Sequence, residues 1–235
     1  AGVGWQIEPG KHLAFDFDDG TSAHDAFGRL LSRSDLGHGA SEVFISPGNS
    51  GGPLLIDGKV AGLASYTFGV SLGPTGLDIN SHTDSSFGEV GSAVRVSSYA
   101  EWIDRTLRAD LPDAPTRPQD VVKEVVEGNS GTTYAYFLVQ LNAPGPAGGS
   151  VDYRTLDGTA VAGEDYVAAS GRLVLYPGEA SAVIPVEIIG DTRAEAPETF
   201  VLEVFNPQGG TFAAGLTQLR ATRTIINDDG ANQLL

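Results

Sequence analysis

The chain has 235 residues, of which 41% are hydrophobic and 19% are charged, a composition typical of folded globular protein. Thirty Asp and Glu residues against fourteen Lys and Arg residues give a net charge of −16, which disfavours nucleic acid and anionic membranes as partners. The sequence contains no Cys, and this excludes disulfides and thiolate metal sites. Its apolar runs are far shorter than the roughly 20 residues of a membrane-spanning helix, so we expect no membrane span.

An acidic segment, Asp16-Phe17-Asp18-Asp19-Gly20, stands near the N-terminus. An EF-hand calcium loop beginning at Asp16 would require Glu at its twelfth position, where this chain has Phe27. We therefore interpret the segment as an acidic turn. A loop cation site is the alternative left open, because hard cations favour clustered carboxylates.

A glycine-rich turn follows, with the sequence Ser46-Pro47-Gly48-Asn49-Ser50-Gly51-Gly52-Pro53. Such a turn suits a catalytic serine, because two backbone N–H groups must converge on an oxyanion while the hydroxyl stays exposed. Gly48 and Ser50 would supply these donors. An ordinary glycine turn is the alternative interpretation.

The next segments predict a hairpin and a helix. Residues 54–63 contain two apolar runs joined by Asp57-Gly58, a dipeptide that favours a two-residue hairpin turn. Ser98 and Glu101 have the spacing of a helix capping box. Four apolar residues fall on one face at helical spacing and predict a helix; they are Tyr99, Trp102, Ile103 and Leu107.

Together these segments resemble the second β-barrel and C-terminal helix of a trypsin-like serine protease, over residues 1–109. The resemblance implies a polypeptide substrate, with Ser50 as nucleophile and the Gly48 and Ser50 amides as the oxyanion hole. It also implies a partner that is missing here, the N-terminal protease barrel with the catalytic His and Asp, upstream of Ala1. We therefore expect this fragment alone to be inactive.

Other positions modify this resemblance. Asn49 stands before the serine where animal members of the family have Asp, and Phe44 occupies the position at the base of the specificity pocket. Phe44 therefore argues against a preference for Lys or Arg at the cleavage site. We interpret the four histidines as solvated loop residues rather than as a catalytic base; they are His12, His24, His38 and His82.

A Pro-rich linker is predicted over residues 110–119, with three prolines in the nine residues from Asp110 to Pro118. Short alternating runs with turn residues between them follow, and seven such strands predict a β-sandwich. The predicted strands are Val121 to Val126, Tyr134 to Leu141, Val151 to Thr155, Arg172 to Tyr176, Ala182 to Ile189, Phe200 to Phe205 and Ala221 to Ile226.

Residues 120–229 resemble a Calx-β domain, an immunoglobulin-like sandwich, and residues 230–235 would form a tail. The motifs include Asp157-Gly158-Thr159-Ala160, Glu164-Asp165-Tyr166, Glu198-Thr199-Phe200 and Asn227-Asp228-Asp229. The resemblance implies Ca²⁺ as cofactor, because acidic residues stand at strand ends where Ca²⁺ collects oxygen ligands. The candidate ligands are Glu127, Asp165, Asp191, Glu195, Glu198, Asp228 and Asp229.

The acidic pattern is thinner than in the richest sites of that family, since Gly190, Thr192, Ala196 and Pro197 replace acidic residues. We therefore expect weaker or fewer ions, and a calcium-free spacer is the alternative. Asp157 and Gly158 are expected to form a tight turn.

The sequence thus predicts an all-β chain and two alternative functions. The first is a secreted or cell-surface serine endopeptidase that carries a calcium-binding Calx-β module. The second is a calcium-dependent adhesion or spacer protein with a degenerate protease scaffold.

Overall fold

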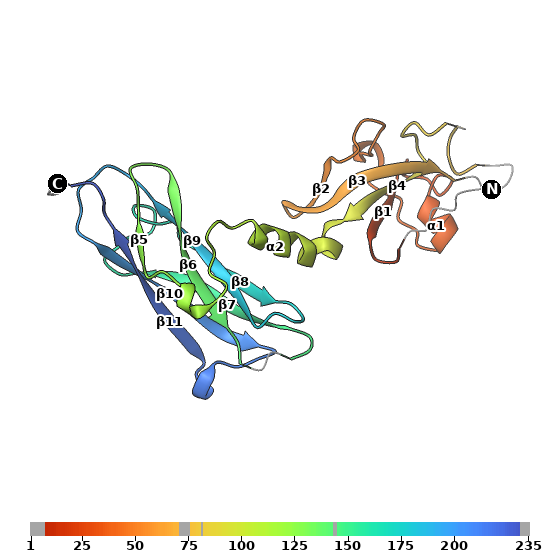
Figure 1. Cartoon of the computed structure of the whole chain (residues 1–235). Coiled ribbons are helices and arrows are strands. Elements are labelled where there is room, and N and C mark those ends of the chain that lie inside the picture. Colours follow the sequence, from red (N-terminus) through yellow and green to blue (C-terminus); the bar gives the residue numbers. More distant parts are fainter. Residues whose placement is uncertain (1–7, 71–75, 81, 143–144, 231–235) are drawn as a thin grey trace. The chain divides into compact units, whose positions relative to one another are not determined.

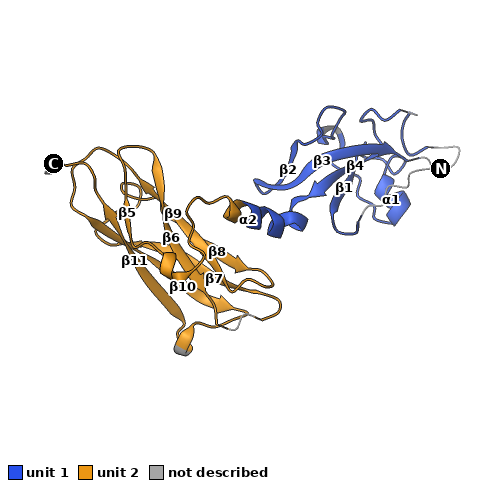
Figure 2. Ribbon diagram, viewed as in Figure 1, with its two compact units in different colours: residues 1–106 blue, residues 107–235 orange. Residues whose placement is uncertain are grey.

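The computed structural model describes residues 8–70, 76–80, 82–142 and 145–230. The chain divides into two compact units, residues 1–106 and 107–235, which Figure 2 shows in different colours. Most of the regular structure is β-strand. The predicted boundaries at residues 109, 119 and 229 stay predictions, and the tail lies outside the described residues from 231 onward.

The first unit is built on one antiparallel sheet of four strands in the order β1-β4-β3-β2 (Figure 1). Their bounds are β1 His12–Asp16, β2 Pro53–Ile56, β3 Lys59–Gly69 and β4 Glu89–Arg95. The predicted hairpin is confirmed as β2 and β3. Its turn residues Asp57 and Gly58 have φ angles of 50° and 74°, the positive values that the Asp-Gly dipeptide supplies.

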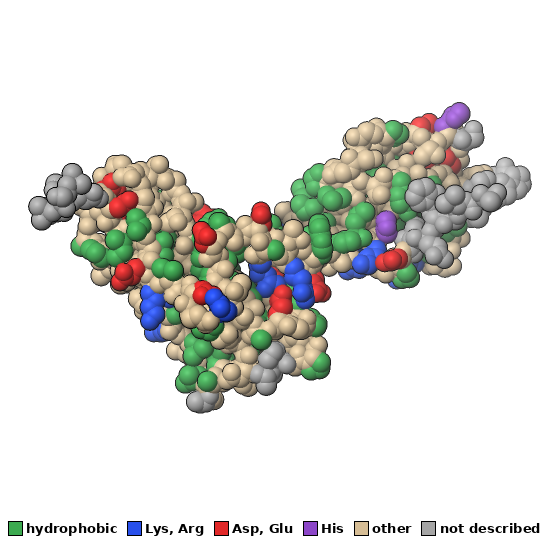
Figure 3. Space-filling model, viewed as in Figure 1, with side chains coloured by type: hydrophobic (Ala, Val, Ile, Leu, Met, Phe, Trp, Pro, Cys, Tyr) green, Lys and Arg blue, Asp and Glu red, His purple; other side chains and the backbone are tan. Residues whose placement is uncertain are grey.

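The predicted trypsin-like barrel does not form in the part of the chain that the structure describes. The sheet is open, with β1 and β2 as its edge strands, whereas a barrel requires the edge strands to pair. Large apolar side chains stay exposed on β2 and β3, and Figure 3 shows hydrophobic side chains gathered over this part of the unit. They are Leu55, Ile56, Val60 and Leu63.

The helices are short. Helix α1 covers Ala26–Leu31 and α2 covers Ala100–Ala109, with the 3-10 turns η1 (Gly39–Ser41) and η2 (Val96–Tyr99) before α2. The predicted C-terminal helix is confirmed, but its capping box is not, and none of its residues is buried. The Ser98 hydroxyl donates to the Gly10 carbonyl at 2.8 Å, and Trp102 is 66% exposed.

The second unit contains seven strands in two sheets (Figure 1). One sheet has the order β5-β11-β10-β7-β8, and the other pairs β6 with β9. The bounds are β5 Glu124–Val126, β6 Thr132–Gln140, β7 Gly149–Asp157, β8 Ser170–Leu175, β9 Ser181–Ile189, β10 Glu198–Gln208 and β11 Gln218–Ile226, with 3-10 turns at Pro118–Asp120 and Ala213–Gly215. The seven predicted strands are thereby confirmed.

The core of this unit is an apolar cluster contributed by both sheets. Phe137 of β6 meets Phe200 of β10 edge to face at 5.8 Å, and Tyr166 stacks on Phe200 at 4.6 Å. The buried guanidinium of Arg223 on β11 also links the sheets, because it donates to the carbonyl of Tyr136 on β6 at 2.7 Å. The alternating apolar residues of the strands thus produce a β-sandwich whose two sheets are joined by aromatic contacts and by the hydrogen bond of Arg223.

Candidate metal centre

The seven predicted acidic ligands lie at the strand ends of the second unit. Glu127 follows β5, and Asp228 and Asp229 follow β11. Strands β5 and β11 run parallel, with Val126 opposite Ile226, so residues that follow them leave the sheet at the same end. Glu198 begins β10 and lies opposite Ile225, which brings it to that end too.

Two loops complete this end of the sandwich. Asp165 lies in the loop between β7 and β8, and its carbonyl accepts from the Ile189 N–H at 2.9 Å at the end of β9. Asp191 and Glu195 lie in the loop between β9 and β10. Segments far apart in the sequence thus deliver carboxylates to one end of the unit.

The first group of carboxylates consists of Glu127, Asp228 and Asp229, whose candidate ligand atoms lie within 4.8 Å of one another. The Gly128 N–H donates to Asp228 at 3.1 Å, and the Asn129 amide donates to Asp229 Oδ1 at 2.5 Å. Asp229 Oδ2 is buried and has no hydrogen-bond partner within the described residues. A buried carboxylate oxygen without a hydrogen-bond donor has the chemistry of a cation ligand.

The second group consists of Asp165, Glu195 and Glu198, again with ligand atoms within 4.8 Å of one another. The Val161 N–H donates to Asp165 Oδ2 at 2.7 Å and holds that side chain in place. Arg193 pairs with Glu195 at 3.0 Å, but its side chain is 72% exposed, so solvent weakens this pairing.

The two groups act on each other electrostatically. Burial raises the pKa of Glu127, and Asp191, Glu195 and Asp228 raise it further. Burial also raises the pKa of Glu198, with further contributions from Asp165, Glu195 and Glu127. Six of the seven residues therefore form two adjoining carboxylate triads, and Asp191, which belongs to neither triad, acts on Glu127 through its charge. We call these seven residues the acidic cluster, and its oxygen-only donor set fits a hard cation such as Ca²⁺.

Asn227 and Gly190 support the cluster in ways that the sequence pattern does not reveal. The Asn227 amide donates to Glu127 Oε1 at 2.5 Å and to the Arg193 carbonyl at 2.6 Å, so it ties the first group to the β9–β10 loop. A Cβ on Gly190 would lie 2.4 Å from the Gly128 carbonyl oxygen. Gly190 is therefore required for the close approach of the backbone segments that follow β5 and β9. Its place in the sequence has this structural reason, in addition to the acidic ligand that it replaces.

Asp157 has a structural role in positioning the loop that follows β7. Its Oδ1 accepts from the Tyr166 hydroxyl at 2.5 Å and from the Ala162 N–H at 3.0 Å. The hydrogen bond from Tyr166 is the main reason that the pKa of Asp157 is lowered. Both donors belong to the loop that carries Asp165, so Asp157 fixes this loop against the end of β7.

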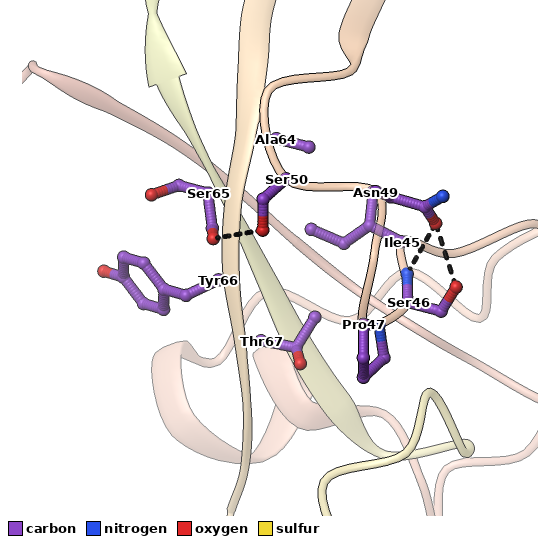
Figure 4. Close-up of a pocket in the computed structure, with 9 residues that line it drawn as sticks. All are labelled: Ile45, Ser46, Pro47, Asn49, Ser50, Ala64, Ser65, Tyr66 and Thr67. Carbon is purple, nitrogen blue, oxygen red and sulfur yellow. Dashed lines mark hydrogen bonds between the residues drawn. The ribbon is translucent and has the colours of Figure 1, made fainter.

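The glycine-rich turn of the first unit lies beside a small pocket, which Figure 4 shows with its lining residues. The Ser50 hydroxyl donates to the Ser65 carbonyl at 3.5 Å, and Gly48 has a φ of 100°. Among the described residues no histidine is hydrogen-bonded to Ser50; His12 contacts Ser92 and His24 contacts Asp19. A nucleophilic serine requires such a base.

Phe44 also differs from its expected place. The described pocket is lined from Ile45 onward, without Phe44. The Phe44 ring instead stacks on Phe17 at 5.0 Å and meets Phe15 edge to face at 5.6 Å. It is therefore a packing residue beneath the sheet.

A β-sandwich with an acidic end is the class of module that this geometry defines. The family model of the Calx-beta domain matches residues 120–230. This part of the chain therefore has the Calx-beta sandwich fold that the sequence predicts.

Three curated proteins are similar to part of this chain. Sodium/calcium exchanger 2 of Homo sapiens is 37% identical over an alignment of 110 residues, and the match covers 40% of this chain and 12% of the relative. Sodium/calcium exchanger Calx of Drosophila melanogaster is 40% identical over 82 residues, 35% of this chain and 8% of the relative. Adhesion G-protein coupled receptor V1 of Danio rerio is 43% identical over 81 residues, 34% of this chain and 1% of the relative. The chain thus spans a small part of these proteins.

Two solved structures are also similar. The apo-form Calx CBD1 domain is 32% identical, with 46% of this chain and 92% of that chain covered and a TM-score of 0.37. The calcium binding domain CBD12 of CALX1.1 is 34% identical, with 46% and 43% covered and a TM-score of 0.38.

These findings overturn the predicted serine endopeptidase. The family model is that of the Calx-beta domain, and the relatives named above are two sodium/calcium exchangers and an adhesion receptor rather than proteases. The Ser50 hydroxyl also has no hydrogen-bonded base in the described chain. The trypsin-like resemblance is unsupported, and with it the polypeptide substrate, the missing barrel and the secreted location. Within the described residues, no helix has the length and apolar character that crossing a membrane demands.

Proposed function

We propose that residues 120–230 form a calcium-responsive module that binds Ca²⁺ through the acidic cluster. The observation that carries this proposal is the convergence of two carboxylate triads, Glu127 with Asp228 and Asp229, and Asp165 with Glu195 and Glu198. The raised pKa values of Glu127 and Glu198 support it, because they reflect unfavourable burial and mutual repulsion that a divalent cation would relieve.

Bound Ca²⁺ would tie together acidic segments that come from different strands and loops. An ion bound by Glu127, Asp228 and Asp229 would join the segments that follow β5 and β11. An ion bound by Asp165, Glu195 and Glu198 would join the β7–β8 loop, the β9–β10 loop and the start of β10. Asn227 contributes by orienting Glu127, and the Val161 N–H by orienting Asp165. Calcium would therefore order this end of the sandwich, and a partner could bind preferentially to the ordered form.

The relatives support a regulatory or interaction role within larger proteins. Their names describe sodium/calcium exchangers and an adhesion receptor, and this chain matches a small part of each. We propose that residues 120–230 likewise serve as one module of a larger protein. The module would act as a calcium-dependent interaction element rather than an enzyme.

The test is a calcium titration by isothermal calorimetry on the full chain after removal of metal with a chelator. Glu198→Gln keeps the shape of the side chain and removes one ligand charge, and we expect Ca²⁺ affinity to fall about tenfold or more. Glu187→Gln is the matched control, because Glu187 is an exposed residue of β9 in the same module.

Thermal unfolding provides the second readout. A ligand that binds only the folded state stabilises it by about 2.7 kcal/mol at a concentration 100 times its Kd. We expect Ca²⁺ to raise the melting temperature of wild type and Glu187→Gln more than that of Glu198→Gln. Absence of calcium binding by the wild type, or equal affinities of the two variants, would refute the proposal.

A further inference from the structure

A separate group of three carboxylates lies in the first unit. Asp16 ends β1, Asp18 follows it by two residues, and Asp25 is the N-cap residue of α1. Their candidate ligand atoms lie within 4.8 Å of one another. Ligands on opposite sides of a Ca²⁺ ion stand about 5 Å apart, because each Ca²⁺–oxygen distance is about 2.3–2.6 Å, so the group is compact enough to share one ion.

Backbone and side-chain hydrogen bonds position two of these carboxylates. Asp16 Oδ2 accepts from the Phe27 N–H at 2.6 Å. Asp25 Oδ1 accepts from the Gly28 N–H at 2.5 Å, and Asp25 Oδ2 accepts from the Ser34 hydroxyl at 2.7 Å. A carboxylate oxygen has a second lone pair, so these bonds fix the groups while leaving capacity to bind a cation.

These hydrogen bonds do not account for the burial of the third carboxylate, that of Asp18. It is 2% exposed, and its Oδ1 is buried with no hydrogen-bond partner in the part of the chain that the structure describes. Burying an ionised carboxylate without a partner is costly, and proteins normally avoid it by pairing the charge or by coordinating a metal. No Lys or Arg forms an ion pair with Asp16, Asp18 or Asp25 within the described ranges.

The surroundings of Asp18 are also acidic. Burial raises the pKa of Asp18 to about 7, and the charged groups that raise it further are Asp16, Asp25, Glu42 and Asp35. The Glu42 carboxylate lies next to Asp18, whose N–H it accepts at 3.4 Å, and it also accepts from the His38 N–H at 2.7 Å. The folded chain thus places several acidic groups around one buried carboxyl group, and no Lys or Arg of the described residues pairs with it.

We propose that Asp16, Asp18 and Asp25 form a second divalent-cation site, distinct from the acidic cluster of residues 120–230, and that its ligand is Ca²⁺. All the donors are carboxylate oxygens, which Ca²⁺ prefers, and no His or Cys joins the group. The ion would connect the end of β1, the loop that follows it and the start of α1. The role of the ion is structural, since it would neutralise the buried carboxylates and hold these three segments together.

The experiment separates this site from the one in the sandwich. A background variant of the full chain, Glu127→Gln, Asp165→Asn, Glu198→Gln and Asp228→Asn combined, removes charge from both sandwich triads. Equilibrium dialysis with radioactive ⁴⁵Ca²⁺ then counts the remaining ions. We expect one ion per chain in this background, and its loss, or affinity weaker by about 10–100-fold, when Asp18→Asn is added.

Asp57→Asn is the matched control, because Asp57 lies in the exposed β2–β3 turn of the same unit and Asn tolerates its positive φ. This control should retain the ion. Zero bound ions in the background variant would overturn the proposal, and so would equal binding by the Asp18→Asn and Asp57→Asn forms. Failure of the sandwich site alone would appear in the Glu198→Gln titration and leave this count unchanged.

A second readout has an unusual sign. In chelator, Asp18→Asn should raise the melting temperature, because it removes a buried charge that has no partner, while the stabilisation by Ca²⁺ at this site disappears. A variant that is less stable in chelator and keeps its calcium-dependent stabilisation would contradict the proposal. Should Asp18→Asn fail to fold, the ion count of the background variant decides by itself.

Discussion

Glu203 shows how single side chains maintain the sandwich away from the acidic end. It lies on the central strand β10, opposite Arg154 of β7 and Arg220 of β11. Its side chain is 2% exposed and pairs with Arg154 at 2.6 Å and with Arg220 at 2.7 Å. The hydrogen bond from Arg220, followed by that from Arg154, lowers the pKa of Glu203.

This lowered pKa predicts a pH dependence. A carboxylate whose pKa is lower in the folded state stabilises the fold above its unfolded pKa, about 4.3, and loses that contribution as pH falls through the folded value. We therefore expect Glu203→Gln to be less stable than wild type at pH 7, with the difference shrinking below about pH 4. Urea unfolding of both proteins at several pH values from about pH 3 to about pH 7 measures this difference in the free energy of unfolding.

The exposed Glu187→Gln variant serves again as the control. Its difference from wild type should be small at neutral pH. A Glu203→Gln difference that stays constant across the pH range would contradict a stabilising role for the ionised carboxylate.

At the level of the elements, the ends of β5 and β9 depend on the absence of a side chain at Gly190. A Cβ there would meet the carbonyl oxygens of Gly128 at 2.4 Å and of Glu127 at 2.8 Å. We expect Gly190→Ala to destabilise the fold by about 1–3 kcal/mol, because backbone atoms must move apart. Calcium affinity should fall as well, since Glu127 lies in the displaced segment.

Gly230→Ala is the matched control, because a Cβ at Gly230 has nothing within 4 Å. Chemical unfolding and a calcium titration of both variants measure the two effects. Equal stability of the two variants would show that the close approach at Gly190 is not required.

The elements also show what a sequence can predict. Asp57-Gly58 indicates its hairpin because the positive φ angles are a local property of those residues. The seven strands of the sandwich follow from apolar alternation, as in β9, where alternate residues are buried. In contrast, the exposed Trp102 of α2 and the open sheet of the first unit depend on which partners a face or an edge meets, and helical spacing or a glycine-rich motif does not contain that information.

The candidate centre was predictable to a similar extent. The seven acidic residues are indicated by their positions at strand ends, but their division into two triads depends on the parallel pairing of β5 with β11, a contact between residues 100 positions apart. Asn227 belongs to the recognised motif, yet its contact with Glu127 is visible only in the structure. In the first unit, the acidic segment that contains Asp16 and Asp18 indicates a candidate cation site from the sequence. The proximity of Asp25 to these two residues is visible only in the structure.

For the whole molecule, a net charge of −16 favours cations over anions as partners. Charge alone would attract cations weakly and everywhere on the surface. The described structure instead concentrates carboxylates at the end of the sandwich and, in the first unit, at one buried point. We therefore expect calcium to bind at specific residues.

The measurement that tests this most directly is a calcium titration of the ¹⁵N-labelled full chain, followed by the backbone amide signals in NMR spectra. Calcium should shift the amides of Gly128, Val161, Arg193 and Asp229, which donate to the cluster or belong to it, and these shifts should saturate together. Unchanged signals throughout residues 120–230, with calcium in excess, would contradict the account.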